Sequence, residues 1–575
     1  MKRVRHEVDF CVIGGGMAGL CAAISAARQG IKVALMHDRP VFGGNASSEI
    51  RVHICGADRH GRIPNVRETG ILEEVRLENL RRNPQRSYSI WDTILYEKVI
   101  CEPNITYLLN CSCQSVDMLG NRIRSAKGWQ LTTQTYHTVE AKTFADCSGD
   151  AILAPLTGAL YRVGRESRDE YGESNAPAVA DTKTMGMTCL FQARDMGSPQ
   201  PFEPPDWAYD FPSDSDLPYR SHNWPEMGYW WVELGGENDS IHDTEKIRDE
   251  LLKIVYGIWD HIKNHGDHGA DNWALEWIQF LPGKRESRRY ISDHVLTQND
   301  LESGGRFSDI VAYGGWEMDD HPPAGFRHKG PPTTFYPTPS PYGIPYRCLY
   351  SRNIENLMFA GRCAGMSHMA MSSARVQGTG CSMGQAVGTA AAIAVKESLT
   401  PREVGQKHIK ELQQLLLAQD CYLPWVKQEF SALTRHAQLK STSSAPDALR
   451  DGINRPVGED EHCWEGYIGD SVEYTWSGLQ PVKNVVLIFD SALHLSIQMS
   501  HHAGHPRLTR VPEEMVKDFR IEIRTRDGWK LLHNVTGNYQ RLVRLPVEAA
   551  VTGVRATFDS TWGAKRVRLY AFYME

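Results

Sequence analysis

A strand–turn–helix–strand pattern at the start of the sequence constrains the fold more than any other feature. Residues 8–13 are almost wholly apolar, which is typical of a strand buried on both faces. Gly14-Gly-Gly-Met-Ala-Gly19 follows, opens a helix of small residues that ends at Gly30, and leads to a second apolar strand at 31–36. In this context a G-x-G-x-x-G turn allows a tight bend, the approach of a pyrophosphate and close helix–strand packing. The sequence therefore predicts a parallel α/β domain that holds a dinucleotide at the positive end of the helix.

The second strand ends at an unusual residue for such a domain. An acidic side chain is expected there, where it would bind the ribose hydroxyls. His37 occupies the position instead, and Asp38 follows it. We expect Asp38 to take over the ribose contact.

Composition and charge exclude several classes of protein. A hydrophobic fraction of 41% and a charged fraction of 23% are typical of a globular chain rather than a disordered one. The 63 Lys and Arg against 70 Asp and Glu give a net charge of −7, which argues against a nucleic-acid partner. The 13 cysteines are scattered without any C-x-x-C pair, as in buried reduced thiols, and they lack iron–sulfur spacing.

The apolar segments predict no membrane span. The longest run of small apolar residues, 386–395, ends at Lys396 and is too short to cross a bilayer. The basic N-terminus leads directly into a predicted strand, without the apolar core of a signal peptide. We therefore expect a cytoplasmic location, unless a signal peptide has been removed.

Further glycine-rich motifs connect the chain to a known family. They are R-P-V-F-G-G-N-A-S-S-E-I-R at 39–51, A-D-C-S-G-D at 145–150 and N-L-M-F-A-G-R at 356–362. With the first glycine turn, they resemble the FAD-dependent oxidoreductases of the glutathione-reductase-like superfold, distant relatives of fumarate reductase and succinate dehydrogenase flavoproteins. The resemblance covers about residues 7–420. It implies an α/β fold, with a Rossmann FAD-binding domain interrupted by a cap domain, and FAD as the cofactor.

The resemblance also implies which residues line the flavin. Gly14, Gly16, Met17, Ala18 and Gly19 would hold the pyrophosphate, and Asp38, Arg39 and the backbone of Cys113 would lie at the adenosine, supported by Gly149 and Asp150. Gly44, Asn45, Ser47 and Ser48 would pass along the ribityl chain and isoalloxazine edge. Gly361, Arg362, Thr379 and Gly380 would face the ribityl chain and pyrimidine ring, at the start of a helix expected over 374–397.

The middle of the chain has the composition of a substrate-binding cap. Prolines concentrate at 199–225 and 322–345, and tryptophans cluster at positions 207, 224, 230, 231, 259, 273, 277 and 316. Tryptophan rings provide platforms for sugar rings, but we expect most of these tryptophans to pack in the core or the lid. Arg285 and Arg288, in the run 285–289, would bind a carboxylate or polyol oxygens, unless this run is a solvated surface.

Two histidines are candidate catalytic bases. Oxidation of an alcohol by a flavin needs a group that accepts the hydroxyl proton, and neutral histidine suits this role at physiological pH. His368 precedes the predicted flavin-facing helix, and His321 ends an Asp-Asp-His segment before two prolines. The sequence predicts that one of them is the base.

Histidine clusters also raise the question of a metal. His261, His265 and His268 lie at and after the end of a predicted helix, 258–264, and His501, His502 and His505 form a second group. No cysteine or glutamate completes a zinc set at either place. We therefore predict no metal site.

The C-terminal part reads as a separate β domain. Thr400-Pro-Arg-Glu403 is a capping box that starts a helix ending near Asp420, and the serine-rich segment 441–446 marks a boundary. Strands are expected at 471–476, 483–489, 493–499, 519–525, 553–558 and 566–573, which favours an antiparallel β-sandwich. This part resembles a discoidin-like jelly roll. Such modules often bind glycans, but structural packing is the favoured role here, with oligomerisation as another.

These observations combine into a domain plan and a function. The plan is a first part of the FAD domain at 1–160, a cap at 161–345, a second FAD part at 346–400, a helical linker at 401–445 and a β-sandwich at 446–575. The favoured function is hydride transfer from a hydroxylated small molecule, most plausibly a sugar or glycoside, to flavin N5 and then to an electron acceptor that the sequence does not identify. Two alternatives stay open: reduction or desaturation of a C=C bond beside a carboxylate, and a glycan-binding protein with a vestigial flavin site.

Overall fold

The computed structural model describes residues 1–500 and 507–575. The chain packs as two units, one consisting mainly of residues 1–56 and 86–409 and the other of 57–85, 410–498 and the C-terminal residues. The sequence does not predict that residues 57–85 join the C-terminal unit. His501, His502 and His505 lie outside the described residues.

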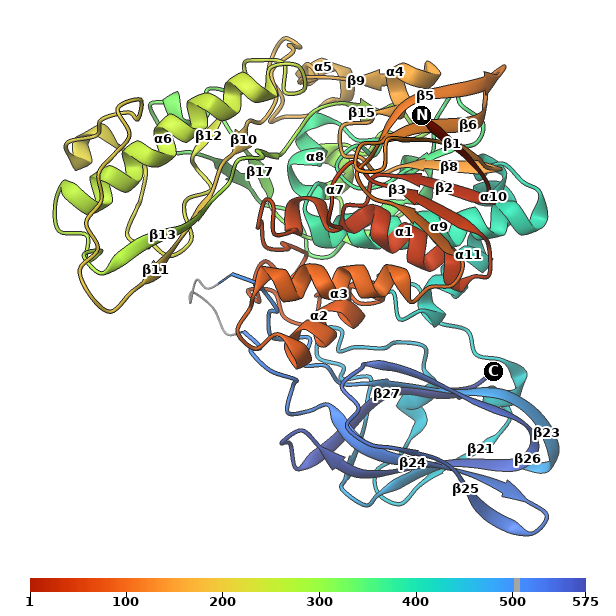
Figure 1. The fold of residues 1–575 in the computed structure, drawn as a ribbon. Coiled ribbons are helices and arrows are strands. Elements are labelled where there is room, and N and C mark those ends of the chain that lie inside the picture. Colours follow the sequence, from red (N-terminus) through yellow and green to blue (C-terminus); the bar gives the residue numbers. More distant parts are fainter. Residues whose placement is uncertain (501–506) are drawn as a thin grey trace. The chain divides into compact units, whose positions relative to one another are not determined.

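A five-stranded parallel sheet forms the centre of the first unit (Figure 1). Its strands, in spatial order, are β20 (Leu357–Phe359), β8 (Thr143–Asp146), β2 (Phe10–Ile13), β3 (Val33–Met36) and β4 (Ile105–Leu108). All residues of the first four are buried, as expected for a parallel sheet covered on both faces. With helix α1 (Met17–Arg28) between β2 and β3, the predicted strand–turn–helix–strand unit is confirmed.

Different layers cover the two faces of this sheet (Figure 1). Helices α1 and α9 (Gln377–Glu397) lie on one face. On the other lies a second sheet in the order β1-β7-β6-β5. Its strands are β1 (Lys2–Glu7), β5 (Cys111–Leu119), β6 (Arg122–Gln130) and β7 (Thr135–Glu140). Helix α3 (Tyr88–Ile100) packs near β4. The helix expected over 374–397 is α9, which begins at Gln377, and a separate short helix, α8 (His368–Ala374), precedes it.

Helices α1 and α9 approach so closely that only glycine fits between them. A Cβ on Gly384 would lie 2.0 Å from the carbonyl oxygen of Ala18, and one on Gly388 would lie 2.1 Å from that of Ala22. Both distances are far below van der Waals contact. Because both helices start near the carboxyl ends of the central strands, this contact brings their N-termini to the same place.

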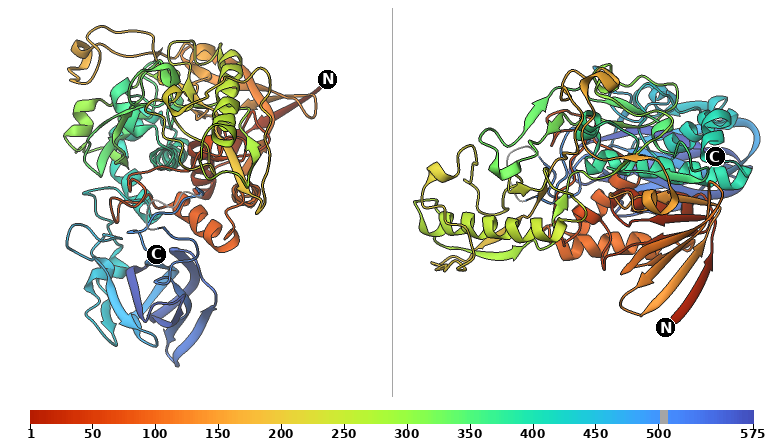
Figure 2. Two further views of the ribbon diagram at one scale, coloured as in Figure 1. Left: turned by 90° about the vertical axis from the view of Figure 1, so that its left-hand side faces the viewer. Right: turned by 90° about the horizontal axis from the view of Figure 1, so that it is seen from above.

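The cap region lies to one side of the parallel sheet (Figures 1 and 2). Helix α6 (Thr244–Asn264) packs by a continuous apolar face, which includes Trp259, in one core with strands β11 (Phe191–Asp195) and β13 (Trp273–Ile278). Short strands complete the region: β9 (Tyr161–Arg162), β10 (Met187–Thr188), β12 (Glu233–Leu234), β14 (Gly283–Lys284), β15 (Arg289–Tyr290), β16 (Ile310–Gly314), β17 (Met318–Asp320), β18 (Thr334–Tyr336) and β19 (Tyr342–Pro345). Its short helices are α5 (Arg168–Tyr171) and α7 (Gln298–Glu302), whereas α4 (Leu153–Thr157) precedes the cap and packs near β5.

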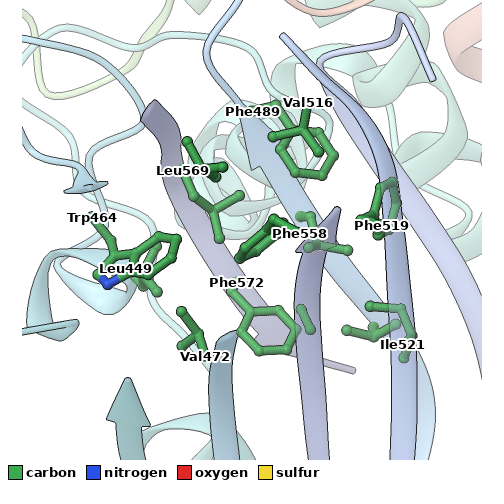
Figure 3. Packing of buried hydrophobic residues seen from close by; sticks show 14 of the residues in the cluster. Leu449, Trp464, Val472, Phe489, Val516, Phe519, Ile521, Phe558, Leu569 and Phe572 are labelled. Atoms are coloured by element: carbon green, nitrogen blue, oxygen red, sulfur yellow. The ribbon is translucent and has the colours of Figure 1, made fainter. Parts of the chain in front are cut away.

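The second unit is a β-sandwich built from one strongly bent sheet. The strand order is β22-β27-β23-β26-β24-β25, with β21 pairing to β23. The bounds are β21 (Gln438–Ser441), β22 (Trp464–Tyr467), β23 (Ser471–Phe489), β24 (Val516–Thr525), β25 (Gly528–Val535), β26 (Leu542–Thr561) and β27 (Arg566–Met574). Register shifts between β23 and β26 allow these long strands to bend, so that each strand contributes to both layers of the sandwich. Trp464, Phe489, Phe519, Phe558 and Phe572 fill the space between them (Figure 3).

Most predictions for the C-terminal part are confirmed, and one strand is wrong. The capping box forms at Thr400 and Glu403, but the helix breaks into α10 (Pro401–Lys407) and α11 (Ile409–Ala418). The remaining helices are α2 (Ile71–Arg82) and α12 (Ala432–Arg435). Residues 493–499 form no strand, although Ile497 and Met499 are buried. Across the described ranges, no helix combines the length and apolar character needed to cross a membrane.

The helix contact predicts the effect of a single added methyl group. In Gly384→Ala the new Cβ meets backbone rather than a movable side chain, so we expect the free energy of unfolding to fall by about 1–3 kcal/mol or more. Urea unfolding measures the change. Gly478→Ala is the control, since a Cβ there meets no atom within 4 Å, and its effect should stay within about 0.5 kcal/mol. Equal effects of the two changes would contradict the close contact.

Candidate active site

The first glycine turn has the geometry that its sequence predicts. Gly14 has a φ of +102°, and a Cβ on it would lie 2.5 Å from the backbone of Cys147. A Cβ on Gly19 would lie 1.8 Å from the carbonyl oxygen of Gly14. Gly16 is open by comparison, with the nearest atom 3.9 Å away, on Gly44. The outer glycines therefore allow the turn and the packing, while the middle one leaves backbone accessible, as a pyrophosphate requires.

Two helix N-termini and an unpaired hydroxyl converge beside this turn. Neither α1, which follows Gly16, nor α9, which follows Val376, has a side-chain cap within the part of the chain that is described. Thr379 lies in the first turn of α9 and is fully buried, and among the described residues its Oγ1 has no hydrogen-bond partner. A buried hydroxyl without a partner is costly and points to a bound group.

The residues expected at the ribityl chain surround the same place. Cβ atoms on Gly361 and Gly380 would lie 3.2 and 3.9 Å from the methyl group of Ala18, next to Met17 at the start of α1. The segments around Gly16, Gly361 and Thr379 therefore line one cradle. Its backbone donors, positive helix ends and free hydroxyl fit the phosphates and ribityl hydroxyls of FAD.

His37 stabilises the glycine turn, and Asp38 beside it is mostly exposed. The backbone N–H of Gly15 donates to His37 Nδ1 at 3.0 Å, so this nitrogen is an acceptor, and Nε2–H donates to the carbonyl of Val41 at 3.1 Å. The Asp38 carboxylate lies 3.3 Å from Nδ1, but its side chain is 62% exposed. The ribose contact of Asp38 stays a prediction.

The other residues expected at the cofactor mostly shape the cradle. Ser47, which ends the turn η1 (Gly44–Ala46), donates through Oγ to the carbonyl of Gly44 at 2.7 Å, and the backbone N–H of Ser48 donates to Asp92. The carbonyl of Arg39 accepts a hydrogen bond from Asn110, and the N–H of Cys111 donates to the carbonyl of His37. Cys113 lies two residues further along β5, near the end of β3, where the adenosine is expected.

Arg362 differs from the expectation that it faces the flavin. Its Nε donates to the carbonyl of Gly149, Nη1 to that of Lys284 and Nη2 to the Asp150 carboxylate, at 2.8–2.9 Å for the carbonyls and 2.7 Å for Asp150. Lys284 Nζ and Ser287 Oγ also donate to Asp150, each at 2.8 Å. Burial would raise the pKa of Asp150, but Arg362 and Lys284 outweigh it and hold that pKa well below its usual range. Arg362 thus positions the cradle wall and joins it to the cap.

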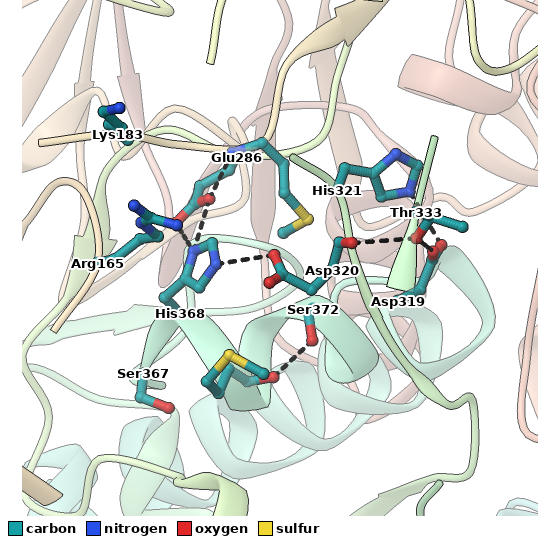
Figure 4. Close-up of polar contacts among 12 residues, drawn as sticks. Arg165, Lys183, Glu286, Asp319, Asp320, His321, Thr333, Ser367, His368 and Ser372 are labelled. Atoms are coloured by element: carbon teal, nitrogen blue, oxygen red, sulfur yellow. Dashed lines mark hydrogen bonds and ion pairs between the residues drawn. The ribbon is translucent and has the colours of Figure 1, made fainter. Parts of the chain in front are cut away.

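The segment 284–290 leads from the cradle to a buried histidine array. Glu286, two residues after Lys284, accepts a hydrogen bond from His368 Nδ1 at 3.0 Å. On the other side of the ring, His368 Nε2 donates to Asp320 Oδ1 at 3.1 Å (Figure 4). The N–H of His368, at the start of α8, donates to Glu166. We call Glu286–His368–Asp320 the first array.

A second array of the same kind is built around His321. His321 Nδ1 lies 2.7 Å from Glu233, and Nε2 lies 3.1 Å from Asp319. Arg285 approaches Glu233 to 3.3 Å, and Arg375 approaches Asp319 to 3.3 Å. The two arrays therefore meet at β17, where Asp319 belongs to the second array and the next residue, Asp320, belongs to the first.

The surroundings raise the pKa of both histidines, which disfavours the predicted neutral base. Burial lowers the pKa of His368, but Glu286 and Asp320 outweigh this effect and raise it to about 10. For His321, burial is likewise outweighed by Asp319 and Glu233, and its pKa is raised. A histidine that carries a proton on both ring nitrogens has no lone pair left and cannot accept a proton from a substrate. Although burial opposes ionisation of Asp320, hydrogen bonding to His368 outweighs it and lowers its pKa, so this carboxylate stays ionised and is the hydrogen-bond acceptor of the pair.

The arginine run is part of this network rather than a solvated surface. Glu286 and Arg289 are buried, and Arg289 lies within 3.5 Å of Glu166 and Glu286. Arg285 donates to Thr188 and to the carbonyl of Trp230. Arg288 instead contacts the carbonyl of Asp150 and the ring of Tyr161.

Sequence reasoning missed the acidic partners of both histidines. Glu286 stands in the run 285–289, and Asp319 and Asp320 precede His321, but the sequence analysis gave none of them a role as a partner. Asp319-Asp320-His321 was the available signal, because alternate side chains of a strand serve opposite faces. Glu233 and Glu286 are far from the histidines in sequence and had no such signal.

Comparison with known proteins settles the family. The family described as FAD dependent oxidoreductase matches residues 9–416. The chain belongs to this family. Its cofactor is therefore FAD, which the cradle fits, and the protein is an FAD-dependent oxidoreductase with a Rossmann FAD-binding fold and a C-terminal β-sandwich. No curated protein matches the sequence.

Solved structures resemble separate parts of the chain. A geranylgeranyl bacteriochlorophyll reductase-like protein from Thermoplasma acidophilum covers 72% of this chain and 88% of its own, at 13% identity and a TM-score of 0.33. The p-nitrophenol 4-monooxygenase PnpA from Pseudomonas putida covers 72% and 86%, at 12% identity and a TM-score of 0.31. A family 32 carbohydrate-binding module of Streptococcus pneumoniae EndoD covers 25% and 99%, at 19% identity and a TM-score of 0.20. These likenesses are too distant to indicate a substrate.

The unpaired hydroxyl of Thr379 predicts a selective loss of FAD affinity. Thr379→Val keeps the shape but removes the donor, so we expect the Kd for FAD to rise about 3- to 10-fold, while the apoprotein unfolds at the same or slightly higher temperature. Thr389→Val is the matched control on the same helix. Its Oγ1 bonds Ser25 and Gln385, so the apoprotein should lose about 1 kcal/mol with FAD affinity unchanged. An unchanged FAD affinity in Thr379→Val would contradict the assignment.

The charged state of His368 predicts a pH-dependent contribution to stability. Its folded pKa of about 10 exceeds the value of about 6.5 in an unfolded chain, so its stabilising effect is complete below about pH 6.5 and is lost as the pH rises through 10. The difference in unfolding free energy between wild type and His368→Gln should therefore shrink steadily from pH 6 to pH 10. His242→Gln, which changes an exposed histidine, controls for the buffer series. A pH-independent difference would contradict a buried imidazolium.

Proposed function

We propose that this oxidoreductase takes hydride from a neutral hydroxylated small molecule, with sugars and glycosides as the favoured class. The observation that supports it is the accessible end of the first array. The side chain of Asp320 is 22% exposed, whereas that of His368 is only 3% exposed. The group available to a substrate is thus an ionised carboxylate, which prefers a hydroxyl donor and repels an anion.

The array has the parts that an alcohol oxidation needs. FAD, when bound, accepts the hydride. Asp320 accepts the hydrogen bond and then the proton of the substrate hydroxyl, and His368 holds the carboxylate in place through Nε2–H. Glu286 fixes the ring through Nδ1–H and keeps it charged. Because Glu286 lies two residues from Lys284, the array is tied to the segment that also contacts Asp150 and Arg362 at the cradle.

A tryptophan beside the second array supports a carbohydrate substrate. The Trp230 side chain is 44% exposed, and its ring lies 5.4 Å from that of His321, edge to face. An exposed ring next to hydrogen-bonding carboxylates suits a sugar, which has apolar C–H faces and a hydroxyl rim.

The alternatives have less support from the same residues. Reduction of a C=C bond beside a carboxylate needs a free arginine at the substrate. Arg285, Arg289 and Arg375 each pair with a carboxylate of the protein, and Arg288 contacts the carbonyl of Asp150 and the ring of Tyr161 instead. In a glycan-binding protein with a vestigial flavin site, nothing would favour keeping the buried, unpaired hydroxyl of Thr379 in the cradle, because that hydroxyl is costly unless a cofactor binds it.

Anaerobic flavin spectroscopy tests the proposal. The oxidised holoenzyme is mixed with neutral polyols, monosaccharides and methyl glycosides, and the dithionite-reduced enzyme with α,β-unsaturated acids. We expect a member of the first panel to bleach the flavin absorbance. Reoxidation by an unsaturated acid, with no bleaching by any neutral alcohol, would overturn the proposal in favour of C=C reduction.

Removal of the Asp320 carboxylate predicts a loss of chemistry without loss of cofactor. In Asp320→Asn, bleaching by the compound most active on wild type should slow by at least about 100-fold, because a general base contributes roughly 10²–10⁴-fold. The FAD content should stay at the wild-type level. Asp293→Asn, which removes a surface carboxylate paired with Arg402, is the control and should keep the wild-type rate. A rate within about threefold of wild type in Asp320→Asn would exclude Asp320 as the base.

A further inference from the structure

Three histidines and an aspartate meet in the cap region, away from both arrays. Asp214, His222, His261 and His268 each place one potential ligand atom within 4.8 Å of the others. The ring centroids of the three histidines lie 4.8–5.0 Å apart. The sequence offered His261, His265 and His268 without a fourth ligand. His265 is not part of the cluster, because its Nε2 lies 3.2 Å from Asp260. His222 and Asp214, which the sequence did not indicate, join His261 and His268 instead.

Hydrogen bonds fix the orientation of two of these rings. His222 Nδ1 lies 2.7 Å from the carbonyl of Arg220, and His261 Nδ1 lies 2.7 Å from that of Phe211. Since a carbonyl only accepts, each Nδ1 carries a proton. In a neutral ring the other nitrogen, Nε2, is then a bare lone pair. A histidine that binds a metal commonly donates its other N–H to a backbone carbonyl in this way.

Both Nε2 atoms face the same carboxylate oxygen. Asp214 Oδ1 lies 3.2 Å from His222 Nε2 and 3.1 Å from His261 Nε2. Three electron-rich atoms at this distance repel one another unless a cation lies among them. A tetrahedral zinc ion with ligands at about 2.0 Å has edges of about 3.3 Å, close to both distances. His268 Nε2 lies 4.0 Å from the same oxygen and 3.2 Å from the carbonyl of His265, so it supplies the remaining corner once the ring exchanges this carbonyl for the ion.

We propose that Asp214, His222, His261 and His268 bind a structural zinc ion. Nitrogen and carboxylate ligands suit zinc, and four protein ligands leave no open position for catalysis. His222 and His261 are buried, whereas the Asp214 side chain is 78% exposed, so the ion enters from solvent and Asp214 covers it.

The ion would hold the outer part of the cap together. His261 lies in the last turn of α6, His268 in the segment after it, Asp214 in the 3₁₀ turn η2 (Asp214–Asp216) and His222 in the loop that follows. This loop continues to Trp230 and Glu233, which lie at the second array. Zinc would thereby fix the loop that carries these residues.

Metal analysis of untagged holoenzyme tests the proposal. We expect about one zinc per chain, removal by a chelator, and recovery on titration with ZnCl₂ alone. Chelation should lower the melting temperature of wild type, and cobalt substitution should give the visible spectrum of a tetrahedral site. Flavin absorbance reports that the protein stays folded.

Matched histidine variants locate the ion. His222→Gln and His261→Gln should weaken zinc binding by at least about 100-fold, since loss of even an outer hydrogen-bond partner costs 10–100-fold. His268→Gln, at the most exposed of the three histidines, serves if the buried variants fail to fold. His265→Gln, the neighbouring histidine outside the cluster, should bind zinc like wild type. The proposal would be overturned if the metal-free protein failed to take up zinc, or if His265→Gln lost as much zinc affinity as the cluster variants. A melting temperature that responds to pH but not to zinc would also overturn it and would indicate that the histidines are imidazolium ions paired with Asp214.

Discussion

The close contact between α1 and α9 is the constraint on which the cofactor site depends. Each helix N-terminus carries a partial positive charge and unpaired N–H groups, but one helix alone reaches only part of a dinucleotide. Gly384 and Gly388 let the two axes approach until backbone touches backbone, at Ala18 and Ala22. Both positive ends then face one cradle, and the buried hydroxyl of Thr379 is presented to it. Any side chain at either glycine would separate the two ends.

A second connection joins this cradle to the residues that handle the substrate. Asp150 follows β8 and binds Arg362, Lys284 and Ser287, so one half-buried carboxylate fixes both the segment that follows β20 and the cap segment 284–287. Glu286 lies within that segment. A shift of the cofactor wall would therefore move Glu286, and with it the ring of His368.

The sequence predicts those features that depend on neighbours along the chain. The turn of Gly14 to Gly19 has a steric cause that can be read locally, and so does the capping box of Thr400 and Glu403. The false strand at 493–499 shows the limit of such reasoning. Alternating apolar residues there indicate burial correctly, but burial does not guarantee a partner strand. The pairing of His368 with Glu286 and of His321 with Glu233, and the meeting of His222 with His261, depend on tertiary packing and leave no local signal.

The buried charges also distinguish the roles of the two arrays. Buried ion pairs give little net stability, because desolvation offsets their attraction, so a network of this size is best explained by chemistry. Asp319 and Asp320 are consecutive in β17, and the pleat directs them to opposite faces (Figure 4). On one face, Arg375 and Arg285 neutralise the carboxylates that flank His321, and this array is an anchor. On the other, no arginine pairs with Asp320 in the described residues, and its only cationic hydrogen-bond partner there is His368, at the start of the helix that leads to α9. Asp320 is thus the carboxylate that a substrate can reach, and it lies on the same face of β17 as His368 and the start of α8.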